Sequence, residues 1–171
     1  MILINGLFSM SEMAVVSARK TTLTNQEKEG KKGAKEALQL ANNPDRFLST
    51  VQIGITLVGL LTGIYSGAAL ADSFAQVFVK LGLSYNVAHM VAQTIIVVIV
   101  TYLTIVFGEL VPKRLGLNLA EKISVTVARP MMCLSKLAAP FVWLLSKTTE
   151  AFVKMLGIDK AETKVTDEDI K

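Results

Sequence analysis

The sequence predicts an all-α membrane protein, with three transmembrane helices accompanied by cytosolic and juxtamembrane amphipathic helices. Of its 171 residues 51% are hydrophobic, and the mean hydropathy is +0.48. Charged side chains are absent from residues 47–71 and again from residues 85–108. Each run exceeds the roughly 20 residues that a helix needs to cross a hydrocarbon core of about 30 Å. A helix of a soluble bundle would carry polar residues on one side at every turn, so these runs favour membrane spans.

The basic residues orient the chain. Its net charge of +4 and pI near 9.2 would also suit a nucleic-acid-binding protein, but the positions of the charges argue against that. Seven of the 18 Lys and Arg residues lie within residues 19–46 and ten follow Glu109, whereas the stretch between the two long runs carries only Lys80. Cytoplasmic loops are enriched in Lys and Arg. We therefore expect the N-terminus outside the membrane and the C-terminus in the cytoplasm.

Polar and apolar segments divide the chain into a transmembrane domain, residues 1–158, and the beginning of a linker, residues 159–171. The first apolar segment is at the lower length limit for a span, so we expect the native first helix to begin earlier. Within the domain we predict spans at about 2–18, 47–66 and 86–108, a cytosolic helical loop at 19–46 and juxtamembrane helices at 117–158. A more amphipathic segment at 66–80 is expected to continue outside the membrane.

Residues 131–145 have two interpretations. They are apolar enough for a fourth span, but Lys136 lies among them and Pro140 interrupts them. Basic residues also recur at intervals of 7 or 11, which places them on one helical stripe: Lys122, Arg129, Lys136, Lys147 and Lys154. A basic stripe on an aromatic, apolar helix is typical of a segment that lies among anionic headgroups, and we favour that placement over a span.

Each predicted span carries one stripe of small or polar residues at helical spacing. The first stripe is Asn5, Ser9 and Glu12, the second includes Gln52, Thr56, Gly59, Gly63 and Ser66, and the third is Thr94, Thr101, Thr104 and Gly108. We expect these stripes to face one another, with Leu, Ile and Val toward lipid. Small residues four apart are also the usual means of close helix packing in membranes, and this alternative stays open for each Gly or Thr.

Glu109 is the most informative of these polar residues. Pro112 lacks an N–H, so the carbonyl of Gly108 loses its helical donor and the helix is expected to break there. A free carbonyl beside a carboxylate supplies the oxygen ligands that hard cations such as Mg²⁺ prefer. The alternative is that Glu109 simply pairs with Lys113, four residues on. Glu12 has a comparable alternative, an ion pair with Arg19 or Lys20.

Other kinds of chemistry find no support in the sequence. Cys133 is the only cysteine, which excludes an intrachain disulfide. His89 is the only histidine, and hydrogen bonding at the membrane interface is its expected role. No nucleophile–base pair, phosphate-binding glycine loop or zinc-ligand spacing is present. The sequence therefore predicts that the chain is not an enzyme.

Three separated motifs carry a family resemblance. They are Phe8-Ser9-Met10-Ser11-Glu12-Met13-Ala14, Arg46-Phe47-Leu48-Ser49-Thr50-Val51-Gln52-Ile53-Gly54-Ile55-Thr56 and Phe107-Gly108-Glu109-Leu110-Val111-Pro112-Lys113. In this order and spacing they resemble the transmembrane domain of the bacterial CorC/hemolysin-related proteins and the animal cyclin-M (CNNM) transporters.

The resemblance implies a homodimer with three transmembrane helices per subunit, located in the bacterial inner membrane. It also implies a cytosolic pair of CBS modules beyond residue 171 and a dehydrated Mg²⁺ held between the spans. By position, Ser9 and Glu109 are the favoured ligands, with Gly59, Thr62, Ser66 and Gly108 as further candidates. Cyclin-M members tend to have Asn where this chain has Gly59, so only a backbone carbonyl would be available there. Supporting roles are expected for Asn5, Glu12, Pro112 and Lys113.

These implications lead to one functional hypothesis and one alternative. The hypothesis is Mg²⁺ efflux, coupled to Na⁺ entry. The alternative is a membrane regulator or scaffold that binds Mg²⁺ and controls another transporter without transporting the ion itself.

Overall fold

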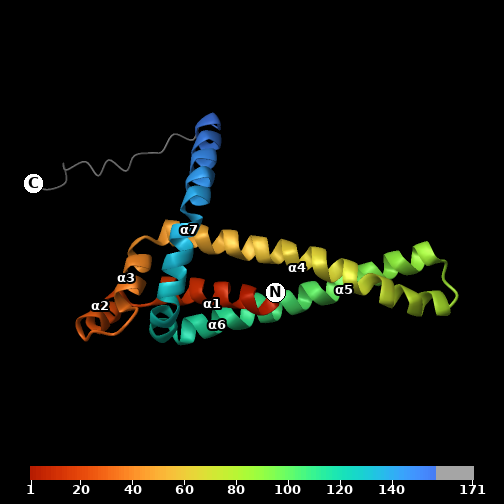
Figure 1. Ribbon diagram of the computed structural model, residues 1–171, viewed down its shortest axis with the longest axis horizontal. Helices are drawn as coiled ribbons and strands as arrows, with labels where there is room; N and C mark the ends of the chain where they lie inside the picture. The colour runs from red at the N-terminus through yellow and green to blue at the C-terminus, as the bar shows by residue number, and fades with distance from the viewer. Residues whose placement is uncertain (157–171) are drawn as a thin grey trace, which may run out of the picture.

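The computed structural model describes residues 1–156, apart from the side chains of residues 66–69, and the predicted linker at 159–171 lies outside the described residues. The described chain is helical almost throughout, as predicted (Figure 1). Its elements are α1 Ile2–Ser17, α2 Lys20–Lys28, α3 Ala34–Asn42, α4 Pro44–Lys80, α5 Tyr85–Ile105, the π-helical turn η1 Val106–Leu110, α6 Val111–Asn118 and α7 Ala120–Met155.

Three helical segments are long and apolar enough to cross a membrane: Pro44–Lys80, Tyr85–Asn118 and Ala120–Met155. The helix α1 is apolar but shorter. The second segment joins α5, η1 and α6 without a break, so the prediction that the helix breaks at Gly108 is wrong. The more amphipathic segment predicted from residue 66 does not begin a new helix, since α4 continues to Lys80.

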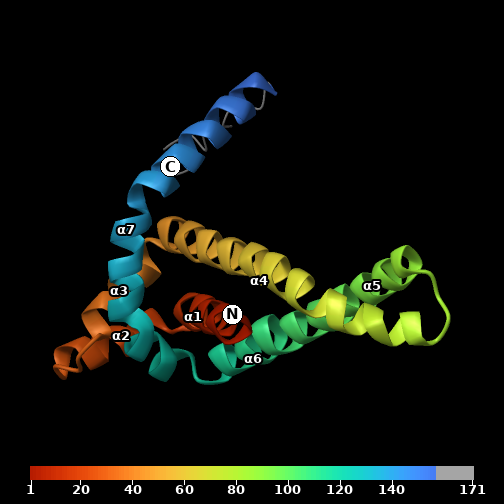
Figure 2. The same ribbon diagram turned by 45° about the vertical axis from the view of Figure 1, so that its right-hand side comes forward.

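The hairpin of α4 and α5 is longer than a bilayer requires. With 37 residues, α4 is about 56 Å long at 1.5 Å per residue, against a hydrocarbon core of about 30 Å. Figures 1 and 2 show the hairpin extending well past the N-terminal end of α1. The hairpin therefore divides into a part that packs beside α1 and a part that consists of α4 and α5 alone.

The helix α7 runs across the other end of the bundle, where α1 ends and α4 begins, and it bends along its length (Figures 1 and 2). Pro130 and Pro140 lie inside it, and proline is the commonest cause of such bends. Many of its large apolar side chains are exposed, among them Phe141 and Trp143. Its length and composition would permit a span, and its predicted position in the headgroup region stays a prediction.

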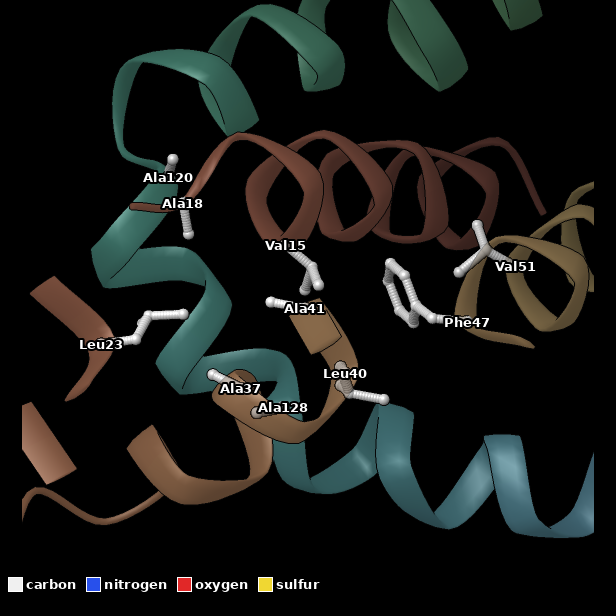
Figure 3. Close-up of a cluster of buried hydrophobic side chains, with 10 residues drawn as sticks. All are labelled: Val15, Ala18, Leu23, Ala37, Leu40, Ala41, Phe47, Val51, Ala120 and Ala128. Carbon is white, nitrogen blue, oxygen red and sulfur yellow. The ribbon is translucent and has the colours of Figure 1, made fainter. Parts of the chain in front are cut away.

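The best-packed part of the chain lies at this same end, not between the long helices. Ten buried apolar residues meet there (Figure 3). Ala18 comes from the α1–α2 connection and the other nine from α1, α2, α3, α4 and α7: Val15, Ala18, Leu23, Ala37, Leu40, Ala41, Phe47, Val51, Ala120 and Ala128. Gly33 begins α3 at φ 91°, and any Cβ there would collide with the backbone oxygen of Val125. This junction fixes the ends of α1 and α4 relative to each other.

Candidate cation-binding site

The helix α1 lies directly along η1 and α6, and glycines permit the contact. A Cβ on Gly6 would lie 3.1 Å from the Phe107 carbonyl oxygen, and one on Gly116 would lie 2.5 Å from the Met10 carbonyl oxygen. A Cβ on Gly108 would likewise contact the side chain of Asn5. Residue numbers rise together along both helices, so α1 and α6 run parallel (Figure 1).

Pro112 changes the register of the helix instead of ending it. The N–H of Val111 donates to the carbonyl of Val106, five residues back, which is the π-helical pattern. Pro112 follows and has no N–H to donate to the carbonyl of either Phe107 or Gly108. A π turn relieves the clash of a proline ring with the preceding turn. The helix is therefore continuous through Gly108, with the Phe107 carbonyl close to α1, and the oxygen-rich corner at Gly108 stays a prediction.

Two buried oxygens of α1 have no hydrogen-bond partner. They are Asn5 Oδ1 and Ser9 Oγ, on side chains that are 6% and 0% exposed. Residues four apart lie on one helical face, so both belong to the face of α1 that contains Gly6. A buried unsatisfied oxygen costs about 1–3 kcal/mol and calls for an explanation such as a bound water or ion. Asn5 and Ser9 thus mark a polar position that the protein itself leaves unfilled.

Three charged side chains join α1 to the helix that contains η1 and α6. Lys113 Nζ lies 2.8 Å from Glu109 Oε1 and 4.0 Å from Glu12 Oε2. All three side chains are partly buried, at 31%, 46% and 24% exposure in that order. Glu12 was expected to pair with Arg19 or Lys20 if it paired at all, and it pairs instead with Lys113 on α6. Both carboxylates are thus joined through one ammonium group.

Of the candidate residues of α4, the structure describes the surroundings of Gly59 and Thr62. Thr62 is buried, but its hydroxyl donates to the Val58 carbonyl at 2.7 Å. A Cβ on Gly59 would meet no atom within 4 Å, and the side chain of Ser66 lies outside the described residues. The helix α4 instead meets α1 at Gly54, against the ring of Phe8.

The expectation that all three polar stripes face inward is wrong for a single chain. Gln52 and Thr56 of α4, and Thr94 and Thr101 of α5, are exposed. The buried face of α5 consists of Ala88, Ala92 and Ile96. Among the stripe residues that the structure describes, Asn5, Ser9 and Gly108 are buried, and the candidate ligand Thr62 is buried as well.

Other metal-binding chemistry is not assembled elsewhere in the described chain. Among residues 1–156, no three His, Cys, Asp or Glu side chains gather closely enough to hold a metal ion. His89 joins α5 to α4 through a contact of 3.1 Å with Asp72. The available cation ligands near η1 are therefore hydroxyl, amide and backbone oxygens with the carboxylate of Glu109.

Sequence reasoning missed Gly6, Gly54 and Gly116, which set the distances between the helices, and the π turn. Small residues were evident in the sequence, but their partners were not. The only local signal for the π turn was Pro112 within an otherwise helical apolar run.

The apolar helices, with a polar face buried between α1 and η1, define a multi-pass α-helical membrane domain. Comparison with known families agrees, because the model of the cyclin M transmembrane N-terminal domain matches residues 1–171. The chain belongs to this family, which confirms the resemblance.

Relatives differ in what their names say. UPF0053 protein sll0260 of Synechocystis is 43% identical over 100% of this chain and 38% of its own length. UPF0053 protein YhdP of Bacillus subtilis is 28% identical over 93% of the chain and 36% of its own length. The polyamine export protein of Haemophilus influenzae is 29% identical over 99% of the chain and 39% of its own length. The chain spans less than two fifths of the length of each of these relatives.

Proposed function

We propose that the chain is the membrane domain of a cation transporter that exports Mg²⁺. The observation that carries the proposal is the pair of unpartnered buried oxygens of Asn5 and Ser9, on the face of α1 that lies against the π turn. Mg²⁺ is bound through oxygen ligands and usually by only one or two carboxylates. The oxygens near η1 have this composition, with Glu109 as the carboxylate.

In the proposed site, Ser9 and Glu109 bind the ion and the carbonyls of Phe107 and Gly108 complete part of its shell. Asn5 is a ligand in this proposal, not only a supporting residue, because its Oδ1 has no other partner. Backbone carbonyls can bind ions at membrane depth where a helix departs from regular geometry and is covered by protein. The helix α1 provides that cover.

Organic polyamines are a second candidate substrate, supported by a specific contact. The primary ammonium of Lys113 contacts Glu109 at 2.8 Å, and polyamines carry ammonium groups of the same kind. Relatives of the chain include proteins named for polyamine export. The two substrate classes share the requirement for Glu109 and differ in their need for Asn5 and Ser9.

A flux assay tests the proposal. The purified chain in sealed liposomes is expected to move Mg²⁺ when a Na⁺ gradient is imposed, and Glu109→Ala is expected to reduce the flux at least about tenfold, because the variant removes the only carboxylate ligand. Glu150→Ala is the matched control, since Glu150 is an exposed residue of α7. Fluorescent Mg²⁺ indicators and radiolabelled putrescine measure the two substrates in parallel.

Each outcome selects one function. Flux of putrescine without flux of Mg²⁺ supports polyamine transport. Binding of Mg²⁺ without any flux supports a regulator or scaffold that binds the ion. Mg²⁺ flux that is equal in Glu109→Ala and in the unaltered chain contradicts the proposed site.

We also propose an orientation and further contacts. The clustering of Lys and Arg supports an N-terminus outside a bacterial inner membrane and a C-terminus in the cytoplasm. The stripe of Lys122, Arg129 and Lys136 on α7 then faces anionic headgroups. The full protein would add a cytosolic CBS pair, which is consistent with the greater length of the relatives.

A second copy of the chain is the proposed partner of α4. Gly59 and Gly63 are four residues apart on α4, and in the single chain nothing lies within 4 Å of a Cβ placed on either. Glycines at this spacing permit close contact between membrane helices. Gly63→Leu is therefore expected to lower the dimer fraction at least about fivefold, which cross-linking in detergent measures. Val98→Leu, at a position that is 62% exposed on α5, is the control, and an unchanged dimer fraction in Gly63→Leu contradicts the assignment.

A further inference from the structure

The charge bridge Glu12–Lys113–Glu109 has a role beyond holding α1 against α6. Lys113 Nζ is 2.8 Å from Glu109 Oε1, a full ion pair, but 4.0 Å from Glu12 Oε2, at the limit of one. Glu109 and Lys113 are one turn apart on the same helical path, whereas Glu12 lies on another helix. The Lys113 ammonium thus lies closer to Glu109, the proposed ion ligand, than to Glu12.

Without an ion, Glu109 needs a positive partner. A carboxylate within a membrane span is costly unless it is paired, and the partner lowers that cost. Lys113 is the group that provides the positive charge in the described structure. It therefore contacts the carboxylate oxygen that a bound cation would require.

The ion and Lys113 compete for the same carboxylate. Two positive charges held close together repel each other by several times more in a partly buried site than in water. A lysine side chain is a compact charge on a flexible four-carbon stem, so it can move without moving its helix. Closing the distance to Glu12 from 4.0 Å to hydrogen-bonding length takes a shift of only about 1 Å.

We propose that Lys113 is a resident counter-cation that neutralises Glu109 when the site is empty and passes to Glu12 when the ion binds. This inference rests on the proposed function, and it adds how the affinity of the site for the ion is set. Because Glu12 belongs to α1, the transfer strengthens the link between α1 and α6 in the loaded state. Lys113 is a positioning residue here and does not touch the ion.

Removing the positive charge should tighten ion binding. The formal charges of Glu12, Lys113 and Glu109 sum to −1, and Lys113→Gln changes the sum to −2. We expect Mg²⁺ to bind at least about tenfold more tightly to Lys113→Gln, whereas Lys113→Arg keeps the affinity near that of the unaltered chain. Glu12→Gln should weaken binding about threefold to tenfold, because the displaced ammonium loses its second partner. Isothermal titration of MgCl₂ into the purified chain in nanodiscs measures all three.

Chemical rescue separates competition from a structural role. In Lys113→Ala, methylammonium chloride should lower the Mg²⁺ affinity again, whereas tetramethylammonium chloride at equal ionic strength should not, because tetramethylammonium is too large and has no N–H or O–H group to donate. This readout does not depend on how well Lys113→Gln folds. A merely structural role for Lys113 predicts no gain of affinity and no difference between the two salts.

The results distinguish this inference from the proposed function. If Glu109→Gln binds Mg²⁺ as tightly as the unaltered chain, the proposed site itself is wrong. If Glu109→Gln loses binding but Lys113→Gln shows no gain, the site stands and the counter-cation role is overturned. Unchanged binding in Glu12→Gln also overturns the transfer to Glu12.

Discussion

Ser9→Ala is expected to make the ion-free protein more stable while abolishing its response to Mg²⁺. Ser9 is fully buried and its Oγ has no hydrogen-bond partner, so the unaltered protein bears the cost of desolvating that hydroxyl. Replacing it by a methyl group removes the cost, and we expect the free energy of unfolding to rise by about 1 kcal/mol. Asn5→Leu, which removes the second unpartnered oxygen, should raise it by about 1–3 kcal/mol.

The response to Mg²⁺ is expected to change in the opposite direction. A ligand at 100 times its dissociation constant stabilises the folded state by about 2.7 kcal/mol. The unaltered chain should show a gain of this order, and both variants should lose most of it. Chemical unfolding in detergent, followed by circular dichroism with and without MgCl₂, measures stability and the response in one experiment.

Ser11 offers a matched control on the same helix. It is as fully buried as Ser9, but its hydroxyl donates to the Leu7 carbonyl at 2.6 Å. Ser11→Ala therefore removes a satisfied hydroxyl, and it should leave stability unchanged or slightly lower and keep the Mg²⁺ response. Equal behaviour of Ser9→Ala and Ser11→Ala would show that Ser9 is an ordinary buried serine and would contradict the cation site.

The membrane class and the helical architecture could be predicted because they depend on long-range composition. Charge-free runs and clustered basic residues have a meaning that does not require knowledge of neighbours. The direction in which each polar stripe faces does require it. Thr94 is exposed and Thr62 is buried, yet the hydroxyl of each donates to the carbonyl four residues back, so the presence of a threonine does not reveal which way it faces.

The same distinction explains what was predicted correctly and incorrectly at Pro112. Loss of a backbone donor follows from the residue type alone, and the structure retains that feature. Whether the helix then ends, kinks or adopts a π turn depends on its surroundings. Here α1 packs along both η1 and α6, and this contact favours a continuous helix. Gly6 of α1 and Gly116 of α6 permit this close contact. They lie about a hundred residues apart in sequence, and only the fold brings them to the same interface.

Gly116→Val is expected to lower the free energy of unfolding by more than about 3 kcal/mol, the upper range for overpacking. A Cβ there would lie 2.5 Å from the Met10 carbonyl oxygen, 3.0 Å from Met13 Cβ and 3.2 Å from the Ala14 nitrogen. Two of these are backbone atoms of α1, so no side chain can rotate away to relieve the contact. The helices α1 and α6 must separate instead, which also separates the two halves of the proposed site.

Leu117→Val controls for the β-branched side chain itself, since Leu117 is the next residue of α6 and is 50% exposed. We expect a cost below about 1 kcal/mol there, because helix propensity alone is affected. Gly116→Ala should fall between the two, since its single Cβ already meets the Met10 oxygen. Unfolding in detergent gives the stabilities and titration with MgCl₂ gives the affinities. Full stability in Gly116→Val would mean that α1 does not approach α6 this closely, and the cation site between α1 and η1 would then lack its cover.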